Sequence, residues 1–241
     1  MFDLFNGEGR MIICGGDEAG RGALLGPLVV SIVGISSSGA RKLAEIGVRD
    51  SKLLSPKRRE ELFDKIRGIA TAIEVDVINA SEINDAMEKG ISLNELEASR
   101  FAKLFDRVEK DVGTIYLDSP DVIEERFGMR VSMYSKKPIR VDGIRRERKP
   151  GIKYTKLVSE HKADVRYPVV SASSIISKVI RDLEIKKLED ASGIELGSGY
   201  PSDFKTIDAL RKNIGNQYLE KHIRRYWKTV DRIRQTKLSY F

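Results

Sequence analysis

The sequence predicts an α/β protein in which the strands of a sheet come early and helices dominate late. Short apolar runs rich in β-branched residues occupy 11–16 and 28–33, as is typical of buried strands. Residues 169–188 instead show the spacing of a long helix after the first few positions. We therefore expect a sheet domain over 1–190 followed by a helical extension over 191–241.

Four segments are predicted to be strands, beginning with 11–16. The run at 28–33 lies between Gly26-Pro27 and Gly34, which are turn residues. Residues 72–78 alternate in polarity, as half-buried strands do. The segment 113–118 is short and apolar and ends at an acid.

Capping residues indicate where helices begin. Ser55-Pro56 predicts one start, because serine caps helix N-termini and proline fits the first helical position. Ser92-Leu93-Asn94-Glu95 has the pattern of a capping box and predicts a second. Two more helices are expected near 203–213 and 216–235. The basic stretch 136–156 is expected to be a mobile loop.

Composition places the chain among globular proteins without a membrane segment. It has 241 residues, of which 41% are hydrophobic and 33% charged. No apolar run has the length of a membrane span, and no secretory leader is seen. A single cysteine, Cys14, permits no internal disulfide and suits a reducing cytoplasm. We expect a cytoplasmic monomer with Cys14 as a small core residue.

The net charge of +7 is unevenly distributed. Residues 136–166 hold eleven Lys and Arg against four Asp and Glu, and residues 211–237 hold nine against two. Two basic regions on a mildly acidic body are typical of a polyanion-binding protein. The alternative is two well-solvated charged faces.

The strongest candidate for a functional site is the segment Gly16-Asp17-Glu18-Ala19-Gly20-Arg21-Gly22. Carboxylates are hard oxygen ligands that suit Mg²⁺ or Mn²⁺. Asp17 and Glu18 are neighbours, so both reach one site only if the strand ends there. Backbone flanked by glycines can approach another molecule closely. A carboxylate pair beside such a loop indicates chemistry on a phosphate-bearing polymer.

Asp118 occupies a comparable position, at the end of a strand and before Ser119-Pro120. If the two strands are neighbours, three carboxylates meet at one edge of the sheet, where they repel one another unless cations neutralise them. Asp118 alone also fits a turn residue. Asp17 and Glu18 alone also fit a helix start. Spacing by itself therefore leaves the metal site open.

Taken together, the motifs resemble type-2 ribonuclease H (ribonuclease HII), and specifically its archaeal branch. The resemblance runs from about Ile12 to Val230. Its segments are Gly16 to Gly22, Gly26 to Val29, Asp50 to Ser55, Leu117-Asp118, His161 to Asp164, Tyr167 to Ile175, Lys178 to Asp182 and Gly197 to Asp203. Each segment is weak alone, and their joint occurrence in this order is specific.

The resemblance implies a ribonuclease H-like fold, with a mixed five-stranded sheet flanked by helices and a helical C-terminal subdomain. It also implies four catalytic and metal-binding carboxylates, which on this chain are Asp17, Glu18, Asp118 and Asp164. Aspartate at the last position favours type 2 over type 3, which usually carries glutamate there and has an additional N-terminal domain.

The implied reaction is hydrolysis of RNA in RNA–DNA hybrids, and cleavage 5′ of ribonucleotides embedded in duplex DNA. Two divalent ions, Mg²⁺ or Mn²⁺, would leave 3′-hydroxyl and 5′-phosphate ends. The implied substrate-binding residues include the 2′-hydroxyl contacts Gly20, Arg21 and Gly22 and the sugar contact Tyr200. Candidate phosphate contacts are Lys52, Lys162, Lys178 and Arg181. Without the resemblance, Tyr200 fits a half-buried turn aromatic and the cations fit solvated charges.

Two positions depart from the family pattern. Gly16 stands where a bulky aliphatic residue is usual, and Ala23 where proline is usual. Both changes are expected to make the loop more flexible, and neither removes a reacting group.

The chain ends Gln235-Thr236-Lys237-Leu238-Ser239-Tyr240-Phe241. Gln235, Leu238, Tyr240 and Phe241 resemble a peptide that binds the replication sliding clamp, although the spacing is one residue short. The alternative is a terminal helix that packs its aromatic residues on its own domain.

Two other functions fit parts of this pattern. A hybrid-binding module that lost catalysis would keep the fold, but the presence of all four acids argues against it. A junction resolvase would act on DNA with similar metals, and the Gly20-Arg21-Gly22 loop and Tyr200 argue against that only through the family.

Overall fold

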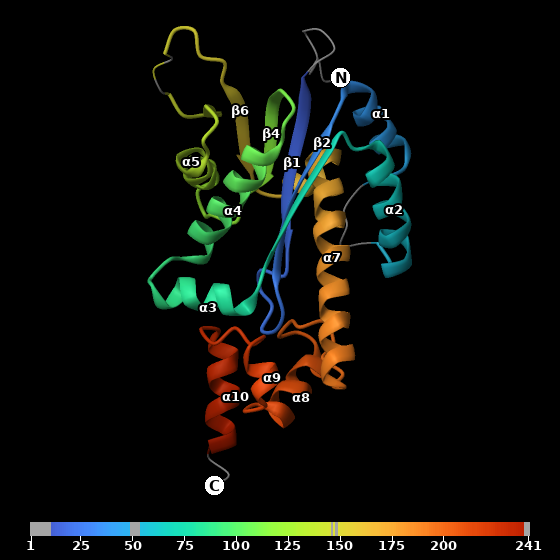
Figure 1. Ribbon diagram of the computed structural model, residues 1–241, viewed down its shortest axis with the longest axis vertical. Coiled ribbons are helices and arrows are strands. Elements are labelled where there is room, and N and C mark those ends of the chain that lie inside the picture. The colour runs from blue at the N-terminus through green and yellow to red at the C-terminus, as the bar shows by residue number, and fades with distance from the viewer. Residues whose placement is uncertain (1–10, 49–53, 146, 148, 239–241) are drawn as a thin grey trace. The chain divides into compact units, whose positions relative to one another are not determined.

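The structure is a computed structural model, and it describes residues 11–48, 54–145, 147 and 149–238, the side chains of 236–238 excepted (Figure 1). These residues form a six-stranded sheet of order β3-β2-β1-β4-β6-β5. The strands are β1 (Ile12–Ala19), β2 (Leu28–Ile35), β3 (Ala72–Ile78), β4 (Val112–Asp118), β5 (Ile139–Val141) and β6 (Thr155–Glu160).

Helices occupy most of the remaining described chain. They are α1 (Ser37–Glu45), α2 (Pro56–Ile69), α3 (Ala80–Glu88), α4 (Leu93–Arg107), α5 (Glu124–Tyr134), α6 (Ala163–Arg166), α7 (Pro168–Ser192), α8 (Phe204–Asn213), α9 (Gln217–Glu220) and α10 (Lys228–Leu238). Among them, no helix is long and apolar enough to cross a membrane.

Parallel pairing joins the strands that carry the candidate acids. β1 pairs with β4 in parallel, with Gly16 opposite Leu117. β4 pairs with β6 in parallel, with Asp118 opposite Glu160. The carboxyl ends of these three strands therefore meet at one edge of the sheet, which is where α/β sheets commonly bind ligands.

Two adjacent glycines let helices cover both faces of β1. A Cβ on Gly15 would lie 2.4 Å from the carbonyl carbon of Val169, so the backbone of α7 rests directly on this residue. A Cβ on Gly16 would lie 2.5 Å from Leu117 Cδ2 and 3.0 Å from Phe101 of α4. Successive strand residues face opposite sides, so α7 and α4 lie on opposite faces.

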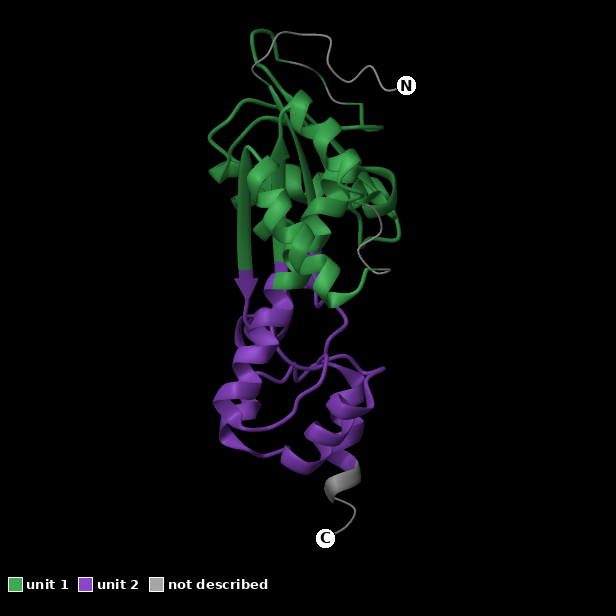
Figure 2. Ribbon diagram, turned by 90° about the vertical axis from the view of Figure 1, so that its right-hand side faces the viewer, with its two compact units in different colours: residues 1–17, 30–76, 97–179 green, residues 18–29, 77–96, 180–241 purple. Residues whose placement is uncertain are grey.

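The chain divides into two compact units, each drawn in its own colour in Figure 2. The first comprises residues 1–17, 30–76 and 97–179 and holds most of the sheet. The second comprises residues 18–29, 77–96 and 180–241. Its core is the buried set Leu24, Leu25, Leu196, Ala209, Leu210, Leu219, Ile223, Val230 and Ile233. The expected boundary at 190/191 between catalytic and C-terminal domains stays a prediction.

The α/β class is confirmed, and so are the strand at 72–78 and the helix begun by Ser55. The sheet has six strands instead of the five expected, because the three-residue β5 pairs with β6. β5 also lies within the stretch 136–156 that was expected to be a loop. Cys14 is buried as expected, and burial raises the pKa of its thiol to about 12.

Two elements differ from prediction for tertiary reasons. β1 continues through the acids to Ala19, and serine side chains of α7 bond to both peptide groups of Asp17. The helix expected over 216–235 is two helices, α9 and α10. Between them, Ile223 forms a β-bridge with Leu25, and Arg224 N–H donates to the Leu24 carbonyl at 2.9 Å. This extended pairing replaces helical hydrogen bonds.

The contact between Gly15 and α7 predicts that Gly15→Ala destabilises the protein. The added methyl group meets backbone atoms at 2.4 Å, and overpacking of this kind costs about 1–3 kcal/mol. Gly113→Ala in β4 is the matched control, since its nearest neighbour would be Met11 Sδ at 3.6 Å. Urea unfolding should show a lower midpoint for the first variant only, and equal midpoints would contradict the account.

Candidate active site

Three of the four predicted acids lie at the carboxyl edge of the sheet. Asp118 ends β4, and Asp17 follows Gly16, the last β1 residue paired with β4. Asp164 lies in α6, which follows β6 directly. Asp17 and Asp164 are 4% and 2% exposed, so both carboxylates are largely removed from water. The parallel pairing of three strands thus gathers these acids at one edge.

The turn between β6 and α6 connects Asp118 to Asp164. The Ala163 N–H donates to Asp118 Oδ1 at 2.8 Å, so the neighbour of Asp164 binds the Asp118 carboxylate. Lys162 precedes it with φ of 56°, a left-handed conformation that non-glycine residues rarely adopt. Such conformations are concentrated at functional sites, where the surrounding structure holds them.

A buried serine network fixes the backbone of Asp17. Its N–H donates to Ser173 Oγ at 3.2 Å, and Ser177 Oγ donates to its carbonyl at 3.0 Å. Ser31 Oγ lies 2.6 Å from Ser173 Oγ and 2.9 Å from Ser177 Oγ. No sequence pattern had assigned these serines a role. The available signal was the i, i+4 spacing of Ser173 and Ser177 within 168–177, the part of α7 that carries no charge.

Glu18 lies in β1 with Asp17. The strand continues to Ala19, whereas a shared site was expected only if the strand ended at the acid pair. Alternation places the two side chains on opposite faces of the strand. Glu18 is the first residue of the second unit. Within the described residues, no three His, Cys, Asp or Glu side chains are grouped so as to hold a metal ion as they stand.

Glu160 is a further acid at this edge, which the sequence analysis did not single out. It pairs in register with Asp118. Arg166 Nη1 donates to its Oε2 at 2.8 Å, and the Tyr167 hydroxyl donates to the same atom at 3.1 Å. Burial and this carboxylate raise the pKa of Tyr167 to about 12. Glu160 therefore orders the segment that carries Asp164.

The loop after β1 has one constrained glycine and one open glycine. Gly20 has φ of +98°, and a Cβ there would lie 2.6 Å from the Pro27 carbonyl oxygen. Gly22 is exposed, and a Cβ there would meet nothing within 4 Å. Arg21 is held at both ends: its side chain bonds to Asn94 Oδ1, and its carbonyl accepts from the buried Arg224 at 2.9 Å.

Tyr200 lies in the same unit, on a loop pinned by side chains. Ser198 N–H donates to Asp203 Oδ2 at 2.6 Å, and Gly199 N–H donates to Thr206 Oγ1 at 2.9 Å. Hydrogen bonds from Ser198, of which the backbone bond is the largest cause, and from the Lys205 backbone hold the pKa of Asp203 below its usual value. Tyr200 is half-buried, and the Arg181 guanidinium carbon lies 4.6 Å from its ring centre.

The candidate phosphate contacts differ in exposure. Lys162 is exposed and Lys178 is half-buried. Arg181 is 0% exposed, which does not suit a direct surface contact with phosphate. Lys52 lies outside the described residues, as do Tyr240 and Phe241. Gln235 is exposed on α10, which ends at Leu238.

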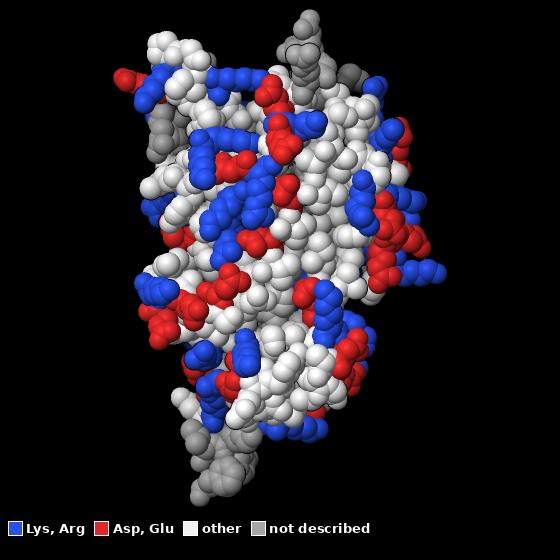
Figure 3. Space-filling view, in the orientation of Figure 1, with Lys and Arg blue, Asp and Glu red and all other residues white. Residues whose placement is uncertain are grey.

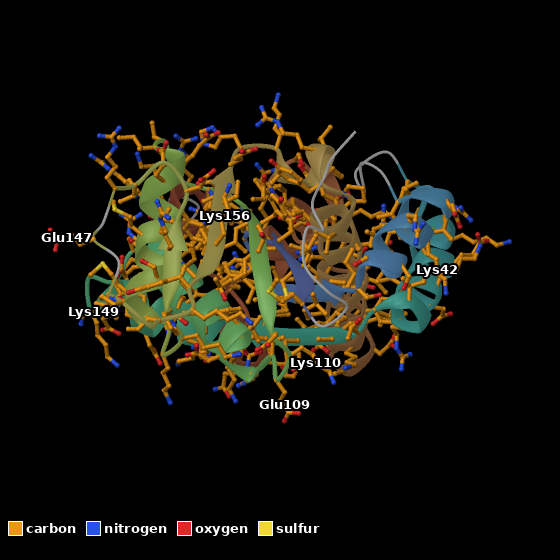
Figure 4. All side chains as sticks on the ribbon, turned by 90° about the horizontal axis from the view of Figure 1, so that it is seen from above. Lys42, Glu109, Lys110, Glu147, Lys149 and Lys156 are labelled. Carbon is orange, nitrogen blue, oxygen red and sulfur yellow. The ribbon has the colours of Figure 1, made fainter. Side chains whose placement is uncertain are left out.

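Acidic side chains interrupt the basic surface of the first unit. Lysine and arginine side chains gather over α4 and α5 with acids between them (Figure 3). Lys42, Lys110, Lys149 and Lys156 project from different sides of the sheet unit (Figure 4). Among the described residues of 136–166, Lys153 pairs with Asp111, Lys156 with Asp142 and Arg166 with Glu160. The predicted polyanion-binding role of these regions stays a prediction.

A cavity of about 580 Å³ lies away from the acid edge. Its lining includes Arg140 of β5, Tyr154 and Lys156, which mark the amino end of β6. The acids lie at the carboxyl end of that strand. The cavity therefore belongs to the opposite edge of the sheet.

The chain is similar to a family model, to known sequences and to solved structures. A family model described as Ribonuclease HII matches residues 14–230. Ribonuclease HII of Pyrococcus furiosus is 39% identical over 232 residues. The match covers 94% of this chain and 92% of the relative's sequence. The crystal structure of ribonuclease H2 from Pyrococcus horikoshii has a TM-score of 0.78 at 37% identity, covering 94% of this chain and 98% of its own.

Two further solved structures are similar. That of the PCNA:RNase HII complex from Archaeoglobus fulgidus has a TM-score of 0.74 at 35% identity and covers 90% of this chain and 96% of its own. That of Bst-RNase HIII in complex with Mn²⁺ has a TM-score of 0.74 at 20% identity. This chain covers only 70% of the type-3 protein. The ribonuclease H-like fold is confirmed.

The two loop glycines predict opposite effects of an added methyl group. Gly20→Ala should destabilise the protein, because a left-handed alanine costs about 1–2 kcal/mol before the clash with Pro27 is counted. Gly22→Ala should leave the melting temperature unchanged or slightly higher. If substrate backbone approaches Gly22, that variant should nonetheless cleave more slowly. Loss of stability in both variants, measured by thermal melting, would contradict this description of the loop.

Proposed function

The chain belongs to the ribonuclease HII family of endoribonucleases, which cleave RNA in RNA–DNA hybrids, and we propose that it also cuts 5′ of ribonucleotides embedded in duplex DNA. The products in this proposal carry 3′-hydroxyl and 5′-phosphate ends. The observation that carries it is the parallel pairing of β1, β4 and β6, which brings Asp17, Asp118 and the segment of Asp164 to one edge.

We propose Asp17, Glu18, Asp118 and Asp164 as the catalytic carboxylates and as ligands of two divalent ions. The donor chemistry fits, because carboxylates are the preferred ligands of Mg²⁺ and Mn²⁺. Among the described residues, no three acidic, His or Cys side chains lie close enough together to hold a metal ion. Since like charges repel, the proposal is that cations draw them together. Mn²⁺ in the structure of Bst-RNase HIII supports the choice of ion.

Divalent ions bound there would activate a water molecule and neutralise the charge of the departing oxygen. The protein's own part is to hold the carboxylates in place. Ser173 and Ser177 fix the backbone at Asp17, and Ala163 N–H orients the Asp118 carboxylate. Asp164, two residues after Lys162 and two before Arg166, is proposed to bind the second ion or to position the water.

Recognition of RNA in this proposal rests on the second unit. The 2′-hydroxyl is both a donor and an acceptor, and it distinguishes RNA from DNA. The exposed Gly22 leaves room for close approach of a sugar, and the backbone of Gly20, Arg21 and Gly22 supplies hydrogen-bonding groups. Tyr200 is proposed to pack against the sugar at an RNA-to-DNA junction. Lys162 and Lys178 are proposed to contact phosphate.

The proposal predicts a specific cleavage pattern. Duplexes containing none, one or several ribonucleotides are incubated with Mg²⁺, with Mn²⁺ or with a chelator, and the products are resolved on a gel. We expect cleavage of the second and third duplexes with either metal and none with chelator. Cleavage of plain DNA would favour a resolvase, and binding without cleavage would favour a non-catalytic module. Either outcome would overturn the proposal.

A variant pair on one strand serves as the control for this assay. Asp118→Asn at the carboxyl end of β4 should slow cleavage at least about 100-fold, since even outer-shell partners of metal ligands cost 10- to 100-fold. Asp111→Asn, just before the other end of β4, removes an exposed ion pair with Lys153 and should have little effect.

We also propose that the C-terminal tail binds the replication sliding clamp. Support comes from the resemblance of Gln235, Leu238, Tyr240 and Phe241 to a clamp-binding peptide and from the PCNA complex of the Archaeoglobus fulgidus relative. A cytoplasmic location and a monomeric state remain predictions.

The tail proposal predicts that deletion of residues 235–241 abolishes capture of the clamp in a pull-down assay. The double variant Tyr240→Ala/Phe241→Ala should give the same loss, because the aromatic pair would fill the clamp pocket. Capture that is unchanged in both variants would exclude the tail as the contact.

A further inference from the structure

Arg181 combines complete burial with an unusual lack of hydrogen bonds. It lies in α7 and is 0% exposed. Its Nε, Nη1 and Nη2 atoms have no hydrogen-bond partner within the described part of the chain. The nearest carboxylate contact joins Nη1 to Asp182 Oδ1 at 3.8 Å. Burial lowers the pKa of Arg181 below its usual value. A charge placed in this way is costly, so its contacts need an explanation.

The strongest contact of the guanidinium is with an aromatic ring. The Cζ atom lies 4.6 Å from the centre of the Tyr200 ring, within the range of a cation–π interaction. Such an interaction is stronger when the cation is desolvated. The ring of the half-buried Tyr200 therefore packs against a buried cation.

Two glycine turns close around the same side chain. A Cβ on Gly20 would lie 2.9 Å from Arg181 Nε, and a Cβ on Gly199 would lie 2.6 Å from Nη2. Gly20 belongs to the loop that carries Arg21 and Gly22, and Gly199 precedes Tyr200 in the chain. One planar group thus contacts the two segments proposed to recognise the ribonucleotide.

We propose that Arg181 is a positioning residue that holds Tyr200 and the Gly20 turn in the geometry needed at a single embedded ribonucleotide. This replaces the expected phosphate contact at Arg181, and it rests on the proposed role of Tyr200. Arginine suits the task, because its flat guanidinium stacks on a ring while it fits between two turns. The compact ammonium group of lysine does neither equally well.

The test compares two substrates in five variants. We measure kcat/KM on a duplex with one ribonucleotide and on an RNA–DNA hybrid, and take the ratio of the two values. Four of the variants are Arg181→Met, Tyr200→Ala, the double variant, and Lys187→Met. The last removes an exposed cation from the same helix, with its side chain 71% exposed. Arg181→Lys tests whether charge alone restores the ratio.

If Arg181 acts through Tyr200, Arg181→Met lowers the ratio about tenfold, as a loss of about 1.4 kcal/mol would. The double variant is then no worse than Tyr200→Ala, because linked residues are not additive. Lys187→Met leaves the ratio unchanged, and Arg181→Lys restores it only in part. Equal loss on both substrates, or an additive double variant, would overturn the proposal. If Arg181→Met instead reduces the slope of log K against log salt concentration by about 1, Arg181 contacts a phosphate directly.

Two measurements keep the test independent of folding and of the role of Tyr200. Melting temperatures should not fall in Arg181→Met, since an apolar residue replaces a charge without hydrogen bonds. The ring resonances of Tyr200, observed by NMR in protein with labelled tyrosine, should shift in Arg181→Met and not in Lys187→Met. Unchanged resonances refute positioning by Arg181. Unchanged cleavage by Tyr200→Ala refutes only the proposed role of Tyr200.

Discussion

Parallel pairing of β1, β4 and β6 is the constraint on which the candidate active site depends. In a parallel sheet all carboxyl ends meet at one edge, so residues distant in sequence meet without any further device. Gly16 lies opposite Leu117, and Asp118 opposite Glu160. A shift of one residue in this register would turn Asp118 to the other face of the sheet. The chemistry of the edge therefore depends on packing that maintains the register.

The packing of α7 supplies much of that maintenance. The helix reaches β1 closely because Gly15 has no side chain, and its serines then bond to the backbone of Asp17. A bulkier residue at position 15 would push α7 away from β1. An apolar residue at position 173 would remove the hydrogen bond to the Asp17 N–H. Gly16, which departs from the family pattern, lies inside β1 with Leu117 and Phe101 filling its space. Its neighbours thus compensate for the missing side chain.

Local patterns in the sequence predicted much of the fold, whereas the set of four acids came from the family resemblance. Alternation predicted 72–78, and the cap at Ser55 predicted the start of α2. β5 has only three residues, too few to show periodicity. The break before α10 depends on Ile223 pairing with Leu25, a contact that no local pattern encodes. Burial of Arg181 likewise depends on Gly20 and Gly199, which come from distant parts of the chain.

We have proposed that the edge formed by β1, β4 and β6 binds divalent cations. The most direct measurement is an anomalous-difference map from crystals of the protein grown with Mn²⁺. If cations bind there, the map will show a peak bound by the carboxylates of Asp17, Asp118 and Asp164. No peak at this edge, with Mn²⁺ ordered elsewhere on the protein, would contradict it.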